Sequence, residues 1–185
     1  EIEYGIAKIE NDQLVQFQKF DNYNNKSWKF KGKYPHPKYE YATLNTNGGH
    51  PGGNFPVVRR ISVFESGEMV LEGSLKHPKD QGDGVKATLF VNGKQIQNWH
   101  SHNNSVNTNS NSFHVNSGDV IELAVEPGKT HSFDSYTWNK KLKLIVDGKS
   151  KDLDLQKYMT AILLASDSFK QLIHIVNIYM DIQYL

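Results

Sequence analysis

The sequence predicts a mainly β protein, an antiparallel β-sandwich of jelly-roll type that carries a short C-terminal helical appendage. From residue 1 to about 148, short apolar runs alternate with polar residues and are separated by turn residues, the spacing typical of a sandwich or barrel. Helical periodicity is hardly visible in this region. Asparagine and glycine are plentiful, and hydrophobic residues make up only 37% of the chain, a mix that suits strands and loops.

Turn residues divide this region into successive strands. Asn11 and Asp12 lie between two apolar runs as in a hairpin, and Asn92-Gly93 is the strongest short hairpin signal in the chain. A further hairpin is expected around residues 65–68. The polar run 102–110 is interpreted as a solvated loop. The expected strands cover residues 6–9, 14–17, 57–63, 69–75, 85–91, 94–99, 111–115, 120–126 and 141–146, the last preceded by Trp138.

The pattern changes after Asp147-Gly148, and this change sets the predicted domain boundary. Residues 1–150 are expected to form the β-sandwich binding domain, and residues 151–185 the helical, apolar appendage. Apolar residues from Leu153 to Leu163 recur at roughly helical spacing, and Asp152 or Asp154 could cap that helix. Residues 169–185 hold too many apolar side chains for one helical stripe, so we expect them to be buried or to bind a protein partner or a second copy of the chain.

Composition excludes several functional classes. The net charge of +1, from 21 basic and 20 acidic residues, does not favour nucleic acid or an anionic membrane surface. The lack of cysteine excludes disulfides, thiolate metal sites, a Cys nucleophile and covalent haem attachment. No apolar run approaches the roughly 20 residues that span a bilayer. The chain begins at Glu1 without a methionine, which fits a mature form after signal cleavage or a segment of a longer chain.

Residues 47–54, Asn-Gly-Gly-His-Pro-Gly-Gly-Asn, place four glycines and a proline around one histidine. Glycine clusters occur where the chain needs positive φ or where another group approaches the main chain closely. We expect this loop to fold tightly at one edge of the sandwich. His50 then either pins the loop to Asp83 or Asp134 or faces a ligand. The first interpretation is favoured, because a buried loop must satisfy its own polar groups.

Eight segments carry a resemblance to a known family. They are Trp28, 34–37 (Tyr-Pro-His-Pro), 48–52 (Gly-Gly-His-Pro-Gly), Arg59-Arg60, 73–77 (Gly-Ser-Leu-Lys-His), 82–87 (Gly-Asp-Gly-Val-Lys-Ala), 117–119 (Ser-Gly-Asp) and 134–138 (Asp-Ser-Tyr-Thr-Trp). In this order, covering about residues 3–165, the chain resembles a β-sandwich module of large planctomycete proteins that also carry cytochrome c-like and planctomycete-specific domains. One departure is Ile61, where the family leads us to expect a tryptophan.

The resemblance implies an exported, carbohydrate-binding-like jelly-roll domain located in the periplasm, outside the cell or on its surface. Sugars bind through aromatic faces and through planar polar side chains that pair with adjacent hydroxyls. Each tryptophan could instead be a core anchor. Alternation puts Arg59 and Arg60 on opposite faces, so at most one points into a given site. The candidate ligand-binding residues are Trp28, His36, His50, Arg59, Lys76, His77, Trp99, Tyr136 and Trp138.

Asp83 and Asp134 are the candidate metal ligands. Carboxylates on glycine-flanked loops, assisted by main-chain carbonyls, make calcium sites, although both residues could simply be turn formers or loop caps. The eight histidines raise a zinc or copper alternative, in which His100 and His102 would share one face of an extended segment. No His-Glu-x-x-His motif accompanies them. Non-covalent haem is a further alternative.

The sequence therefore predicts a non-catalytic module that binds carbohydrate or a cell-surface glycoconjugate. No cofactor is certain. We expect the protein not to bind nucleic acid and to have no transmembrane segment. No Gly-x-Ser-x-Gly elbow is present, and paired carboxylates for glycoside cleavage cannot be placed from sequence. Two alternatives remain: an assembly module that docks through its apolar C-terminal tail, and a metal- or haem-associated protein.

Overall fold

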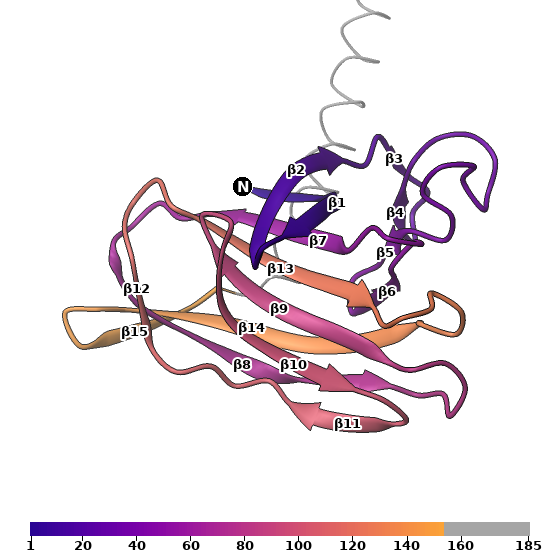
Figure 1. Ribbon diagram of the computed structural model, residues 1–185. Helices are drawn as coiled ribbons and strands as arrows, with labels where there is room; N and C mark the ends of the chain where they lie inside the picture. The colour runs from indigo at the N-terminus through magenta and orange to yellow at the C-terminus, as the bar shows by residue number, and fades with distance from the viewer. Residues whose placement is uncertain (154–185) are drawn as a thin grey trace, which may run out of the picture. The chain divides into compact units, whose positions relative to one another are not determined.

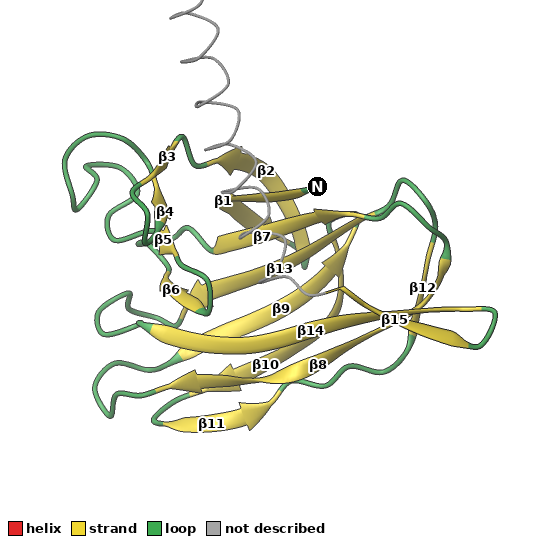
Figure 2. Ribbon diagram, turned by 180° about the vertical axis from the view of Figure 1, so that it is seen from behind, coloured by secondary structure: helices red, strands yellow, loops and turns green. Residues whose placement is uncertain are grey.

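Two antiparallel β-sheets face each other, and no helix occurs among the residues that the structure describes (Figures 1 and 2). The structure is a computed structural model that describes residues 1–153. The prediction of a mainly β fold built from antiparallel sheets is confirmed. Nothing in this part of the chain has the helical length and hydrophobicity needed to cross a bilayer.

The first sheet is a ring of six strands. Its strands are β1 (Ile2–Glu10), β2 (Gln13–Lys19), β7 (Val57–Ser62), β9 (Val85–Val91), β10 (Lys94–Ser101) and β13 (Val120–Pro127). They follow the order β1-β2-β10-β9-β13-β7, and β7 pairs again with β1. A single residue pair, Lys94 with Gln13, joins β10 to β2. The ring is therefore extensively paired everywhere except at this seam.

Side chains on both faces of β7, β9 and β13 are mostly buried, whereas β2 and β10 expose many of theirs. One face turns into the ring, where five side chains form one apolar cluster: Ala7, Leu14, Val58, Phe90 and Ala124. The alternate residues, such as Leu89 and Leu123, are also fully buried and face the second sheet. The alternation that predicted the strands thus also builds two apolar layers.

The second sheet carries the order β11-β8-β14-β6-β5-β4-β3, with β12 added to β8 and β15 added to β14. Its strands are β3 (Asn22–Tyr23), β4 (Trp28–Lys29), β5 (Thr43–Leu44), β6 (Gly48–His50), β8 (Gly67–His77), β11 (Asn104–Asn107), β12 (Phe113–Val115), β14 (Tyr136–Val146) and β15 (Lys149–Leu153). The long pairing of β8 with β14 forms its centre, and Trp138, Leu142 and Leu144 point from β14 into the layer between the sheets.

The short turn signals are confirmed. Asn11 and Asp12 have φ angles of 51° and 59°, and Asn92 and Gly93 have 51° and 76°. Two consecutive positive φ angles are what a tight hairpin requires, because that geometry matches the twist of the flanking strands. These turns connect β1 to β2 and β9 to β10.

Two expectations about longer connections are corrected. Residues 65–68 do not close a hairpin, because β7 pairs with β1 and β13 while β8 pairs with strands of the second sheet. The segment instead crosses from one sheet to the other. The polar run 102–110 is more than a solvated loop, since β11 lies within it and pairs with β8.

The second sheet extends past the predicted boundary at residue 150. Asp147 and Gly148 have φ angles of 48° and 73° and form another tight hairpin, after which β15 runs to Leu153. Residues 151–153 therefore belong to the sheet. The expected helix from Leu155 onward and the apolar segment 169–185, with the partner or second copy that it was expected to bind, lie outside the described residues.

The ring interior makes a direct stability prediction. Phe90→Ala is expected to lower the free energy of unfolding by about 3–5 kcal/mol, because a fully buried aromatic side chain is replaced by a cavity. Ile96→Ala, at a side chain that is 43% exposed, is expected to change it by less than about 0.5 kcal/mol. Urea denaturation followed by tryptophan fluorescence measures both, and equal losses would contradict the assignment of the core.

Candidate ligand-binding site

A buried arginine holds the glycine-rich loop. Arg59, which is 2% exposed in β7, donates from Nη2 to the carbonyl oxygens of Asn45 at 2.6 Å and Gly48 at 3.0 Å. A Cβ atom on Gly48 would lie 2.0 Å from the Tyr136 carbonyl oxygen, and Gly49 lies equally tightly against β5. The glycines are therefore required because β6 approaches its neighbouring strands too closely for a side chain.

His50 lies on this loop, but its partner differs from the predicted one. Its Nδ1 lies 2.5 Å from the carbonyl oxygen of Pro51, and its ring packs against Tyr41. The hypothesis that His50 pins the loop to Asp83 or Asp134 is corrected, because its hydrogen bond stays within the loop.

Four predicted ligand-binding side chains lie in the interior. They are Arg59, His77, Tyr136 and Trp138, none more than 4% exposed. The indole Nε1 of Trp138 donates to Thr108 Oγ1 at 2.9 Å, and His77 Nε2 donates to the Phe133 carbonyl oxygen at 3.0 Å. Strand alternation turns them between the sheets, where Arg59, His77 and Trp138 make hydrogen bonds that are internal to the fold. Their assignment as ligand-binding residues stays a prediction.

The remaining predicted side chains are partly or fully exposed but do not gather. Trp28 is half-buried and stacks on Tyr4 with ring centroids 5.2 Å apart. Trp99 is half-buried and meets Trp138 edge-on at 6.3 Å, whereas Lys76 is exposed near the end of β8. Within residues 1–153, no hydrogen bond or ring contact joins Trp28, Trp99 and Lys76 to one another.

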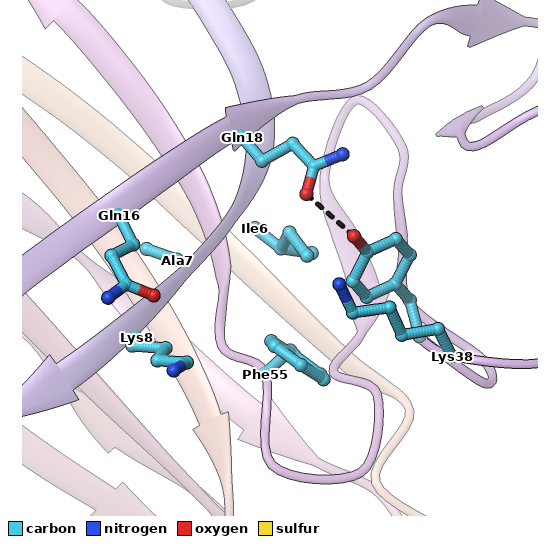
Figure 3. Close-up of a pocket in the computed structure, with 8 residues that line it drawn as sticks. Ile6, Ala7, Lys8, Gln16, Gln18, Lys38 and Phe55 are labelled. Atoms are coloured by element: carbon cyan, nitrogen blue, oxygen red, sulfur yellow. Dashed lines mark hydrogen bonds between the residues drawn. The ribbon is translucent and has the colours of Figure 1, made fainter.

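A hollow of about 310 Å³ lies where β1 and β2 meet two loops, the β4–β5 loop that carries Tyr39 and the β6–β7 loop that carries Phe55 (Figure 3). Its lining residues are Ile6, Ala7, Lys8, Gln16, Gln18, Lys38, Tyr39 and Phe55. The rings of Tyr39 and Phe55 meet edge-on at 5.1 Å, and Tyr39 Oη donates to Gln18 Oε1 at 2.7 Å. The hollow thus combines aromatic surface with amide and ammonium groups.

A bulge in β2 shapes one wall of the hollow. Ile6 pairs with Gln18 and Lys8 pairs with Val15, so two residues of β2 oppose one of β1. Gln16, inside the bulge, has a φ of 54°, a left-handed conformation that is unfavourable for a residue with a side chain. Bulges of this kind bend a strand and redirect its side chains, and they are frequent beside binding sites.

His36 supports the opposite wall. Its Nδ1 accepts hydrogen bonds from the backbone N–H groups of Lys38 and Tyr39, each at 3.2 Å, and its ring stacks on Tyr39 with centroids 4.8 Å apart. His36 does not line the hollow. Among the sequence-predicted residues it is a positioning residue for this site.

Sequence reasoning missed the residues that line the hollow. Glutamines and lysines on a predicted hairpin are normally solvated, and nothing in the pattern around Gln16 and Gln18 indicated a bulge. The one available signal was the glycine-rich loop itself: a Cβ atom on Gly52 would lie 2.0 Å from the Tyr39 carbonyl oxygen, so the loop must wrap around Tyr39 and present Phe55 beside it.

The candidate metal ligands Asp83 and Asp134 meet where two loops adjoin. A Cβ atom on Gly82 would lie 2.8 Å from the Ser132 carbonyl oxygen and 3.5 Å from Asp134 Oδ1. The Asp83 carboxylate accepts hydrogen bonds from the Lys129 and Thr130 backbone amides. Within residues 1–153, no three His, Asp or Glu side chains gather as a metal-binding group.

The comparisons with known proteins find distant structural similarity only. No protein-family profile and no curated protein sequence matches the chain. The PA14 domain of the MpAFP antifreeze protein is 13% identical, with a TM-score of 0.40, over 83% of this chain and 87% of that chain. A family 35 carbohydrate binding module from an environmental isolate is 13% identical, with a TM-score of 0.36, over 83% of this chain and 97% of that chain. Rabbit GITRL is 17% identical, with a TM-score of 0.35, over 55% and 79%.

The burial of His50 predicts a pH dependence of stability. Burial lowers the pKa of His50 below its ordinary 6.5, and the neighbouring His131 lowers it further. As the pH falls, His50 is therefore protonated in the unfolded chain at a higher pH than in the folded protein. The stability that neutral His50 contributes is fully present above pH 6.5 and is lost as the pH falls through the lower pKa of the folded state.

Consequently, His50→Gln is expected to lose less stability than the parent protein between pH 7 and pH 5. Urea denaturation of both proteins across this range measures the difference in the free energy of unfolding. The same comparison at pH 8, where His50 is neutral in both states, gives the change in stability that the substitution causes without any protonation. Parallel pH profiles for the two proteins would contradict the prediction.

Proposed function

We propose that this protein is a non-catalytic module that binds carbohydrate in the hollow between β1, β2 and the two loops that carry Tyr39 and Phe55. The observation that carries the proposal is the meeting of aromatic surface with planar amides and ammonium groups in one concave site. A sugar presents C–H faces that pack on aromatic rings and hydroxyl pairs that match such polar groups.

Each wall has a distinct role. Phe55 and Tyr39 supply the apolar surface, and the amides of Gln16 and Gln18 each offer both a donor and an acceptor. Lys8 and Lys38 add donors at the exposed rim. A volume of about 310 Å³ is near the lower end for ligand sites, so the hollow suits a short segment of a glycan.

The cellular setting rests on the sequence resemblance. Similarity to the β-sandwich module of large planctomycete proteins supports an exported protein that meets its glycan, or a glycoconjugate, outside the cytoplasm. The assembly alternative depends on residues 169–185, which lie outside the described part of the chain.

Substitutions in the hollow test the proposal. A glycan array identifies a ligand for the parent protein, and calorimetric titration then compares variants. Gln18→Ala is expected to weaken binding roughly 3–10-fold through loss of hydrogen bonds, and Phe55→Ala at least as much through loss of the aromatic face.

Tyr34→Ala is the matched control, because Tyr34 is 47% exposed and does not line the hollow. The Tyr34→Ala variant should bind the glycan with the same affinity as the parent protein. Failure of the parent protein to bind any glycan, or an equal loss in Tyr34→Ala and Phe55→Ala, would reject the site.

The left-handed conformation of Gln16 predicts opposite effects on stability and binding. Gln16→Gly is expected to raise the free energy of unfolding by roughly 0.5–1 kcal/mol, because glycine removes the steric cost of positive φ but adds entropy to the unfolded chain. The same change removes an amide from the hollow and should weaken glycan binding. Denaturant titration and calorimetry measure the two effects, and a less stable variant that binds normally would contradict both parts.

A further inference from the structure

The junction of residues 82–84 with residues 128–134 contains a buried carboxylate without a partner. Asp134 is fully buried, and neither carboxylate oxygen accepts a hydrogen bond of normal geometry from residues 1–153, although the Gly128 amide lies nearby. Buried carboxylates that lack both a hydrogen-bond donor and a positive charge beside them are rare, because removing a negative charge from water costs much free energy. Asp134 must therefore either hold a proton or have a cation beside it.

The nearby Asp83 makes a negative charge on Asp134 still less favourable. Its carboxylate lies at the same junction and is held by the Lys129 and Thr130 amides and by Thr130 Oγ1 at 3.3 Å. Burial and, to a smaller extent, the Asp83 charge raise the pKa of Asp134 to about 7, although the nearby Gly128 amide acts in the opposite direction. A buried carboxylate and a half-buried one thus lie near each other at this junction.

The surrounding main chain brings further oxygen atoms close. Gly82 has a φ of 81° and lacks a side chain where the Ser132 carbonyl oxygen and Asp134 Oδ1 approach it. Carboxylate and carbonyl oxygens are the ligands of calcium, which accepts six to eight of them in a flexible arrangement.

The adjacent imidazoles are engaged by the loops. His77 Nε2 donates to the Phe133 carbonyl oxygen, His100 Nε2 to that of Asp83 at 3.0 Å, and His102 Nε2 to that of Asp80 at 3.2 Å. The backbone amide of Asn103 donates to the other ring nitrogen of His77. These rings fix the loops around the two carboxylates and leave an oxygen-rich site, whereas zinc prefers nitrogen or sulfur ligands.

We propose that Asp134 and Asp83 hold a calcium ion at this junction, with loop carbonyl oxygens completing its coordination. The ion joins the loop after β8 to the loop between β13 and β14. This site shares no residue with the hollow proposed for carbohydrate, so either proposal can fail without the other.

The test is the thermal unfolding midpoint of the purified protein, stripped with EDTA and then titrated with calcium chloride at pH 7.5. At calcium concentrations about 100 times the Kd, the midpoint should rise by roughly 5–10 °C. Isothermal titration calorimetry of the parent protein should give one site per chain. A midpoint and a calorimetric trace that do not respond to calcium would overturn the proposal.

Asp134→Asn should abolish the calcium response, and in EDTA it should be at least as stable as the parent protein, because it removes the buried charge. Asp83→Asn should weaken calcium binding at least tenfold. Glu10→Gln, which removes an exposed carboxylate far along the sequence, is the matched control and should respond like the parent protein. A full calcium response in Asp134→Asn would place the ion elsewhere and overturn the assignment.

Discussion

The hydrogen bonds that Arg59 donates to Asn45 and Gly48 tie the glycine-rich loop to the most heavily paired part of the first sheet. From there the chain continues through Phe55 into β7, so these hydrogen bonds help to hold the segment that supplies one wall of the hollow. The guanidinium lies in the layer between the sheets with a second cation. Burial lowers the pKa of Lys140 well below its ordinary value, and Arg59 lowers it further.

Local signals predicted the fold well because they depend on neighbours in the sequence. The hairpins at Asn11-Asp12 and Asn92-Gly93 require only two residues with positive φ, and alternation marks each strand by its own side chains. Pairing between distant strands has no such signal. Residues 65–68 therefore resembled a hairpin turn although they carry the chain from one sheet to the other.

The site was harder to predict, because the type of a residue does not reveal whether its side chain points into the interior or toward solvent. Trp138 and His77 have the chemistry of ligand contacts, but alternation turned them inward. Gln16 and Gln18 have ordinary surface chemistry, yet a bulge brings them to a concave wall. Asp83 and Asp134 were named from their glycine-flanked and loop contexts, and their proximity follows from the meeting of two loops far apart in the sequence.

Because a single pair joins β10 to β2, the edges of these two strands that face each other are largely unpaired, whereas their other edges pair with β9 and β1. Such open strands can template intermolecular pairing, which is the first step of aggregation. Both strands carry a register shift, β2 opposite Ala7 and β10 at Ile96, and each shift twists its strand out of the flat geometry that a second molecule would need. The bulge in β2 that shapes the hollow therefore also distorts this edge against pairing with a second molecule.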